Sequence, residues 1–218
     1  MAIQIRVDPQ HLEQLKAGMP DLGLSASLRA QRRLGKMLGV HGPYDTKGQL
    51  IADGLARLVE KAIVEYELTK AELFEFLPHG YLAHYHRAQD HFESLIQCLH
   101  RAITYLDRLR ALGYRVADGS PLVPRPRDLE VLRDTTKSVV RSFRDRLEHM
   151  DEDILAGKLD AASDVGPRLG TLAAELGDTT LAYADVARWC HQLHGFARLL
   201  SEVTLTTGEP SPSGESDA

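Results

Sequence analysis

The sequence predicts an all-α protein, an antiparallel up-and-down helical bundle with an N-terminal helical extension. Several long segments carry apolar residues at every third or fourth position, which places those residues on one face of a helix. Segments rich in glycine and proline separate these stretches and provide the turns that reverse the chain. Strand-like alternation occurs only near the N-terminus, at Ile3, Ile5 and Val7. A short β element there would not change the fold class.

Residues 1–45 are predicted to form an arm that carries a short basic helix. The alternating segment stops at Asp8-Pro9, and a short helix is expected over residues 9–17. A second helix is expected over residues 27–38. It carries four cationic side chains, Arg29, Arg32, Arg33 and Lys36. Their charge is compatible with a solvated face or with a binding surface.

The bundle itself is predicted over residues 46–205. Its first helix should begin at Thr46 and end before Pro78, with a break near Thr69 as an alternative to a continuous helix. Residues 81–112 contain neither proline nor glycine and predict the longest helix. Two such helices joined by a short turn should pack against each other to bury their apolar stripes.

The second half of the bundle is predicted to contain two more helices. One should run over residues 127–156, with an inward-facing stripe made of Val140, Phe143, Leu147, Met150 and Ile154. A loop is expected after Gly157, and the last helix should cover residues 183–203. Residues 206–218 are polar, acidic and rich in proline, glycine and serine, so we expect a disordered tail.

The composition narrows the choice of partners and compartment. The formal net charge of −5 disfavours nucleic acids and anionic membranes as partners, unless a local basic patch exists. The two cysteines, Cys98 and Cys190, lie far apart in predicted helices, which suits free thiols in a reducing compartment. No apolar run approaches the length of a membrane span, and residues 1–10 do not resemble a signal peptide. We therefore expect a cytoplasmic protein without membrane attachment.

Few residues suggest a cofactor or a metal. The chain has no glycine-rich phosphate loop, nucleophile elbow, paired Cys-x-x-Cys or His-Glu-x-x-His motif. Two histidine pairs have helical spacing, His84 with His91 and His191 with His194, but no Glu-x-x-His pair accompanies them. A polar helix face explains these histidines as well as a metal does. No cofactor and no metal is expected.

Residues 141–152 are the most informative stretch. Arg144-Asp145 is followed by His149, and three cations precede or overlap this motif at spacings of three or four residues, Arg133, Lys137 and Arg141. This spacing predicts one basic row on a helix, which could contact an RNA backbone. On a straight helix, Arg144 and His149 project about 140° apart, so one chain would not bring them together.

The Arg144-Asp145 pair with His149 resembles the signature of the HEPN superfamily, an arginine and a polar residue followed by a histidine after a short spacer. The preceding helix, with His84, His86 and His91, and the closing helix, with Ala187-Arg188-Trp189, are also similar to members of this family. The resemblance covers roughly residues 80–203. One family feature is missing, because the toxin subgroup has a tyrosine two residues after the histidine and this chain has Asp151 there.

The resemblance implies a homodimer that cleaves RNA without a metal. In HEPN ribonucleases, arginine and histidine side chains from two chains line one cleft, and the ribose 2′-hydroxyl attacks the adjacent phosphate. Arg144, Asp145 and His149 would then form the catalytic site, with Arg144 on the phosphate and His149 transferring protons.

An alternative without catalysis remains open. Arg144 can pair with Glu148, and His149 with Asp145 or Glu152, simply as charged neighbours on an exposed helix face. Acidic residues around His149 would also repel an RNA backbone. The chain would then be a HEPN-like module for dimerisation or for binding a partner protein.

Overall fold

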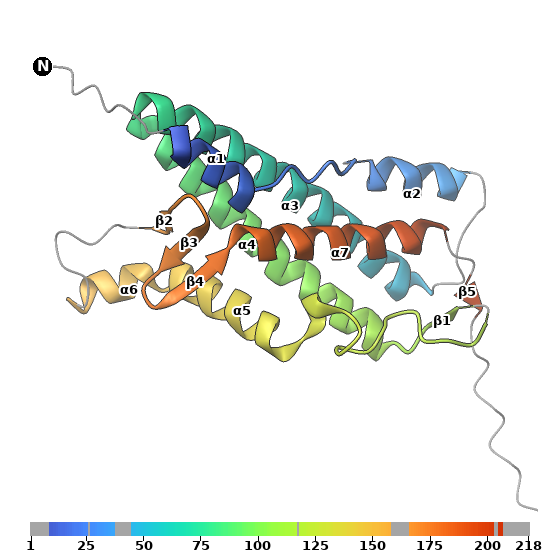
Figure 1. The fold of residues 1–218 in the computed structure, drawn as a ribbon. Helices are drawn as coiled ribbons and strands as arrows, with labels where there is room; N and C mark the ends of the chain where they lie inside the picture. The colour runs from blue at the N-terminus through green and yellow to red at the C-terminus, as the bar shows by residue number, and fades with distance from the viewer. Residues whose placement is uncertain are drawn as a thin grey trace, which may run out of the picture.

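The computed structural model describes residues 9–25, 27–37, 45–116, 118–157, 166–202 and 205–206. The strand-like segment at residues 3–7 and residues 207–218 of the predicted tail lie outside this range, whereas Thr206, predicted to begin the tail, belongs to a strand. Within it, the chain is mostly helical (Figure 1). The helices are α1 (Pro9–Gly18), α2 (Leu28–Met37), α3 (Thr46–His79), α4 (Leu82–Ala111), the 3₁₀ helix η1 (Glu130–Leu132), α5 (Asp134–Glu148), α6 (Met150–Leu155) and α7 (Tyr183–Glu202). The strands are β1 (Arg115–Val116), β2 (Arg168–Leu169), β3 (Ala173–Leu176), β4 (Thr179–Ala182) and β5 (Leu205–Thr206).

Helices α3 and α4 form a long antiparallel hairpin. Asp45 caps α3 by accepting a hydrogen bond of 2.7 Å from the N–H of Gly48, and Gly80 ends the helix with a φ of 64°. The prediction that α3 ends before Pro78 is wrong, because the helix continues to His79. Pro78 lies in the last turn, so the helix loses one backbone hydrogen bond and no more. Nor does α3 break at Thr69, whose hydroxyl donates to the carbonyl of Glu65 at 2.7 Å.

The prediction of a single helix over residues 127–156 is also wrong, since this segment is divided into η1, α5 and α6. Arg133 has an extended backbone, with ψ at 143°, and separates η1 from α5. His149, with φ at −106° and ψ at 13°, separates α5 from α6. As a result, the predicted inward stripe stops early, and Ile154 on α6 is 46% exposed.

A small antiparallel sheet, β2-β3-β4, occupies the region predicted to be a loop. Strands β3 and β4 pair with Leu176 opposite Thr179, which leaves Gly177-Asp178 as a two-residue turn. Gly177 has a φ of 60°, and a positive φ at the first turn residue is typical of a type II′ hairpin. The N–H of Leu169 donates to the Tyr85 hydroxyl at 2.9 Å, which attaches the sheet to α4.

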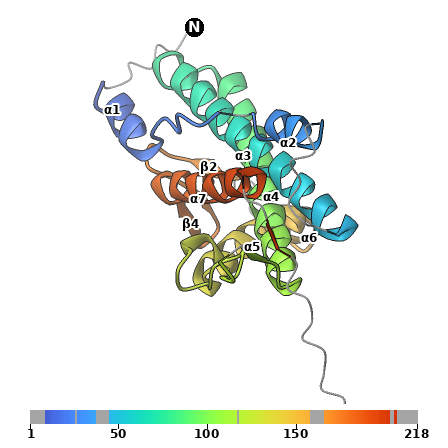
Figure 2. The same ribbon diagram turned by 90° about the vertical axis from the view of Figure 1, so that its right-hand side faces the viewer.

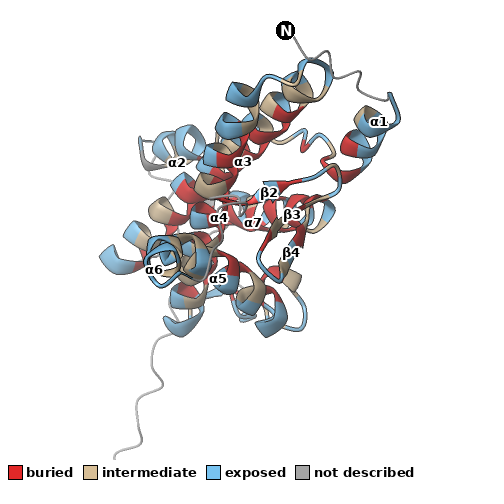
Figure 3. Cartoon of the chain, turned by 90° about the vertical axis from the view of Figure 1, so that its left-hand side faces the viewer, coloured by how far each residue is buried: buried red, intermediate tan, exposed pale blue. Residues whose placement is uncertain are grey.

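The core lies between the α3–α4 hairpin, α5 and α7. Phe92 on α4 makes edge-on contacts with Phe143 on α5 and with Tyr183 at the start of α7, at centroid distances of 5.8 and 6.0 Å. Figure 3 shows the buried residues on the facing sides of these elements, while α6 has no buried residue. Both α1 and α2 contribute to the same core, through Leu15 and Leu28.

The observed architecture therefore agrees with the predicted class in its helical content and its packed helix pairs, and differs from it by the small sheets. Helix α7 runs across the α3–α4 hairpin instead of alongside it (Figures 1 and 2). Cys98 and Cys190 are buried free thiols, as predicted. No helix in the described part of the chain is long and apolar enough to cross a membrane.

Candidate functional site

The motif residues lie on α5 and at its C-terminal end. The inner face of α5 carries Val140 and Phe143, both fully buried against α4 and its neighbours. Because these two residues fix the rotation of the helix, Arg141, Ser142 and Asp145 fall on its outer side. Packing of the apolar stripe thus decides which polar side chains reach solvent.

His149 occupies the junction between α5 and α6. Its N–H donates to the carbonyl of Asp145 at 3.0 Å, and its own carbonyl accepts from Asp153 at 3.1 Å, so the backbone is held from both sides. The imidazole is 59% exposed, and its Nδ1 lies 3.3 Å from a carboxylate oxygen of Glu152. His149 is therefore fixed in position but accessible to a ligand.

Arg144 is held by two carboxylates of its own helix. Its Nη1 lies 2.7 Å from Asp145 Oδ1, and its Nη2 forms an ion pair with Glu148. The Arg144 side chain is 30% exposed, and its positive charge lowers the pKa of His100 on α4. The predicted contacts of Arg144 with Glu148 and of His149 with Glu152 are both present. Within the part of the chain that the structure describes, Arg144 makes no hydrogen bond or ion pair with His149.

A shallow depression of about 390 Å³ lies along the outer face of α5. It contains two motif residues, Asp145 and His149, but not Arg144. The other lining residues are Ser138, Arg141, Ser142, Arg146 and Asp153. Arg141 precedes His149 by two helical steps of four residues, so it is Arg141 that shares a face with the histidine.

The predicted basic row is not uniform. The ammonium of Lys137 lies 2.8 and 2.7 Å from the two carboxylate oxygens of Asp107 on α4, so its charge is matched within the fold. Arg133 is exposed at the start of α5. Arg141 is exposed and has no hydrogen bond or ion pair with the residues that the structure describes. Of the three predicted RNA contacts, Arg141 is the one that faces the depression.

His100 on α4 was not identified from the sequence. Burial lowers the pKa of its imidazole, and the positive charges of Arg144 and Arg141 lower it further, while Asp145 and Glu148 oppose this effect. The pKa of His100 therefore depends on the charged residues of the motif, because α4 packs against α5. Nothing in its own sequence neighbourhood indicates this proximity, which arises from the packing of α4 on α5.

Other residues around the depression could have been found by helical spacing. Ser138, Ser142, Asp145 and His149 follow one another by steps of four, three and four residues. Arg146 is different, because its ion pair with Asp178 joins α5 to the hairpin turn that the sequence did not predict.

Three of the four histidines considered as metal ligands have other partners. Nδ1 of His84 lies 2.6 Å from Glu72, and Nδ1 of His91 lies 2.7 Å from Glu65, each carboxylate being on α3. His194 lies 3.2 Å from the carbonyl oxygen of Ser25. In the described ranges, no group of three or more histidine, cysteine, aspartate or glutamate side chains could hold a metal ion.

Comparison of the chain with protein-family models, curated proteins and solved structures found no match.

Proposed function

We propose that this protein is a HEPN-like, metal-independent endoribonuclease whose site is completed by homodimerisation. One observation carries the proposal: the exposed imidazole of His149 shares a depression with the exposed cation Arg141 and with the hydroxyls of Ser138 and Ser142. A proton-transferring group beside a phosphate-binding cation is what cleavage by a ribose hydroxyl requires.

In the proposed reaction, the ribose 2′-hydroxyl loses its proton and attacks the adjacent phosphorus. The bond to the 5′-oxygen of the next nucleotide then breaks, and that oxygen takes up a proton, which leaves a 2′,3′-cyclic phosphate. His149 transfers protons in this exchange, a task for which an imidazole is suited near neutral pH. Arg141 holds the phosphate from the same chain.

The second protomer has a defined role in this proposal. Because Arg144 pairs with Asp145 and Glu148 and does not line the depression that contains His149, Arg144 would assist His149 across a dimer interface. Arg144 would exchange its contacts with Asp145 and Glu148 for the phosphate oxygens, which a forked guanidinium binds with two donors.

A second candidate function is a non-catalytic module for dimerisation or for binding a partner protein. The observation in its favour is that Arg144 is already paired with two carboxylates, while Glu152 lies beside His149. Asp151 and Asp153 add negative charge to the same short helix. An RNA backbone would have to approach against these charges.

Incubation of the purified chain with total RNA separates the two candidates. The nuclease proposal expects cleavage that survives EDTA, products ending in a cyclic phosphate, and at least about a hundredfold loss in His149→Ala. The melting temperature of His149→Ala should stay close to that of the wild type, because the side chain is exposed.

The matched control is His191→Ala, which removes an exposed histidine from α7. This variant should cleave RNA at the wild-type rate. If the wild type does not cleave RNA, the non-catalytic candidate is favoured. If wild type and His149→Ala cleave equally well, the activity comes from a contaminant and the proposal is wrong.

A further inference from the structure

A second charged surface lies where α2 packs on α3, beside α4. Two adjoining pockets of about 290 and 480 Å³ occur there, between α2, α3 and α4. Arg29 and Arg57 line both of them. We refer to the two together as the arginine pocket, whose charged lining residues are Arg29, Arg32, Arg33, Asp53, Arg57, Glu60, Lys61 and Arg101.

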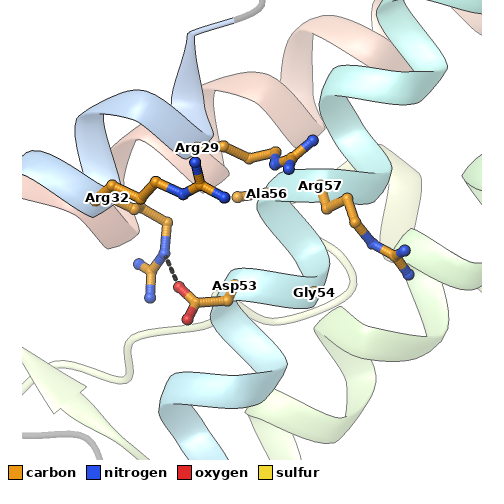
Figure 4. A pocket seen from close by; sticks show the side chains of 7 residues that line it. Arg29, Arg32, Asp53, Gly54, Ala56 and Arg57 are labelled. Atoms are coloured by element: carbon orange, nitrogen blue, oxygen red, sulfur yellow. Dashed lines mark hydrogen bonds and ion pairs between the residues drawn. The ribbon is translucent and has the colours of Figure 1, made fainter.

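The arginine pocket carries a strong local excess of positive charge. Six cationic side chains face two anionic ones, which leaves four formal positive charges in a chain whose net charge is −5. Figure 4 shows Arg29 and Arg32 on α2 beside Asp53 and Arg57 on α3. Bringing like charges together costs free energy, which a bound anion would offset.

The two carboxylates are largely engaged by α2. Asp53 accepts a hydrogen bond of 2.7 Å from Nε of Arg32, a side chain that is 9% exposed and also donates to the carbonyl of Leu200. Glu60 accepts from the backbone N–H of Arg29 at 2.6 Å, while the Arg29 guanidinium lies 3.8 Å away. These contacts hold α2 against α3, and they leave the guanidinium of Arg29 only weakly paired.

Three of the remaining cations are open to a ligand, whereas Lys61 lies 3.8 Å from a carboxylate oxygen of Glu65. Arg33, Arg57 and Arg101 are exposed and have no hydrogen bond or ion pair within the part of the chain that the structure describes. The same charges affect the pKa of the neighbouring Cys98 thiol. Burial raises its pKa, whereas the positive charges of Lys61, Arg101 and Arg57 oppose the rise.

The pocket has a less polar end as well. Leu58, Val64 and Cys98 line the larger pocket, together with the amide of Gln97. Val64 is 44% exposed, so it presents an apolar surface beside the arginines. Both volumes fall in or close to the range of about 300–1,000 Å³ that holds small ligands.

We infer that the arginine pocket binds a small phosphorylated molecule. Arg29 and Arg57 hold the phosphate at the boundary of the two pockets, with Arg33 and Arg101 on either side. The organic part of the ligand lies against Leu58 and Val64. Guanidinium groups suit this task because their fork of donors matches phosphate oxygens. The inference does not rest on ribonuclease activity.

Isothermal titration calorimetry of the full chain with inorganic pyrophosphate tests whether the arginine pocket binds phosphate groups. At an ionic strength held constant with NaCl, we expect saturable binding and a higher melting temperature with pyrophosphate than without it. Arg57→Gln and Arg101→Gln should each weaken binding about tenfold or more. ADP should bind more tightly than pyrophosphate if the apolar end contributes.

Two control variants make the result specific. Arg125→Gln removes an exposed arginine outside the pocket and should bind pyrophosphate like the wild type. His149→Ala should also bind normally, so a failure of the nuclease proposal would not affect this one. Because Arg57 and Arg101 are exposed, both variants should keep the wild-type circular dichroism spectrum.

Three outcomes would overturn the inference. The first is the absence of saturable binding of both pyrophosphate and ADP. The second is equal binding by wild type, Arg57→Gln and Arg101→Gln. The third is binding of a single-stranded RNA oligomer that depends on Arg57 while neither small probe binds, since the surface would then recognise a polymer.

Discussion

At the scale of single residues, Arg144 interacts both with carboxylates of α5 and with a histidine of α4. Its ion pairs with Asp145 and Glu148 keep the guanidinium close to the helix, and its charge acts on His100 of α4. Arg144 therefore affects a titratable group that the sequence places 44 positions away. This connection can be measured in the absence of any substrate.

We predict that Arg144→Gln raises the pKa of His100. Removing the guanidinium deletes a positive charge that lowers this pKa, and it leaves Asp145 and Glu148 free to raise it. NMR titration of the His100 ring, assigned with His100→Gln, measures the effect. Arg125→Gln is the control and should leave the titration unchanged. An identical His100 pKa in Arg144→Gln and wild type would contradict the placement of Arg144 against α4.

The same group makes stability depend on pH. Since the pKa of His100 is lowered from 6.5 in the folded chain, the unfolded chain binds more protons just below pH 6.5. The free energy of unfolding should therefore fall as the pH decreases from about 6.5 through the lowered pKa. Denaturant unfolding at several pH values should show a smaller decrease in His100→Gln than in wild type. An equal decrease in both would contradict this role of His100.

At the scale of elements, the phase of α5 decides which of its residues support the fold. Phe143 is fully buried against Phe92, whereas Leu147 is only partly buried near the end of the helix. The predicted apolar stripe contains both residues and does not distinguish between them. The structure distinguishes them, because α5 ends at Glu148 and the chain turns away.

We predict that Phe143→Ala costs about 3–5 kcal/mol of unfolding free energy, through lost burial and a residual cavity. Leu147→Ala should cost clearly less, because part of its side chain is already in water. Urea unfolding of both variants measures the difference. Equal losses would mean that α5 is rotated relative to the arrangement described above.

At the scale of the whole molecule, the short helix α6 that follows His149 exposes apolar side chains. Helix α6 buries none of its residues, and its side chains Ile154 and Leu155 are 46% and 87% exposed. Apolar side chains exposed beside a proposed composite site are expected if a second chain covers them.

We predict a homodimer of twice the 24.2 kDa chain mass that uses α5 and α6. Light scattering at tens of micromolar should give this mass for the wild type and a monomer mass for Leu155→Glu. Leu50→Glu is the matched control, because Leu50 on α3 is 66% exposed and lies outside the proposed interface. A wild-type monomer would remove both the dimer and the composite site.

Much of the helical framework could be predicted from the sequence. The stripe of Leu95, Leu99, Leu106 and Leu109 indicates the buried face of α4, and all four residues are fully buried. Periodicity succeeds here because an apolar face must be buried whatever lies opposite it. The β3–β4 hairpin was missed, although two short runs separated by Gly177-Asp178 are a recognised hairpin signal.

The candidate sites depended more on tertiary structure. The sequence predicted that Arg144 and His149 diverge on one straight helix, but α5 ends at Glu148 and the junction at His149 decides where the imidazole lies. Only the packing of α4 on α5 placed His100 near Arg144. Only the packing of α2 on α3, and of α3 on α4, brought Arg29 together with Arg57 and Arg101. Helical spacing specifies neighbours within an element, whereas contacts between elements depend on how their buried faces fit together.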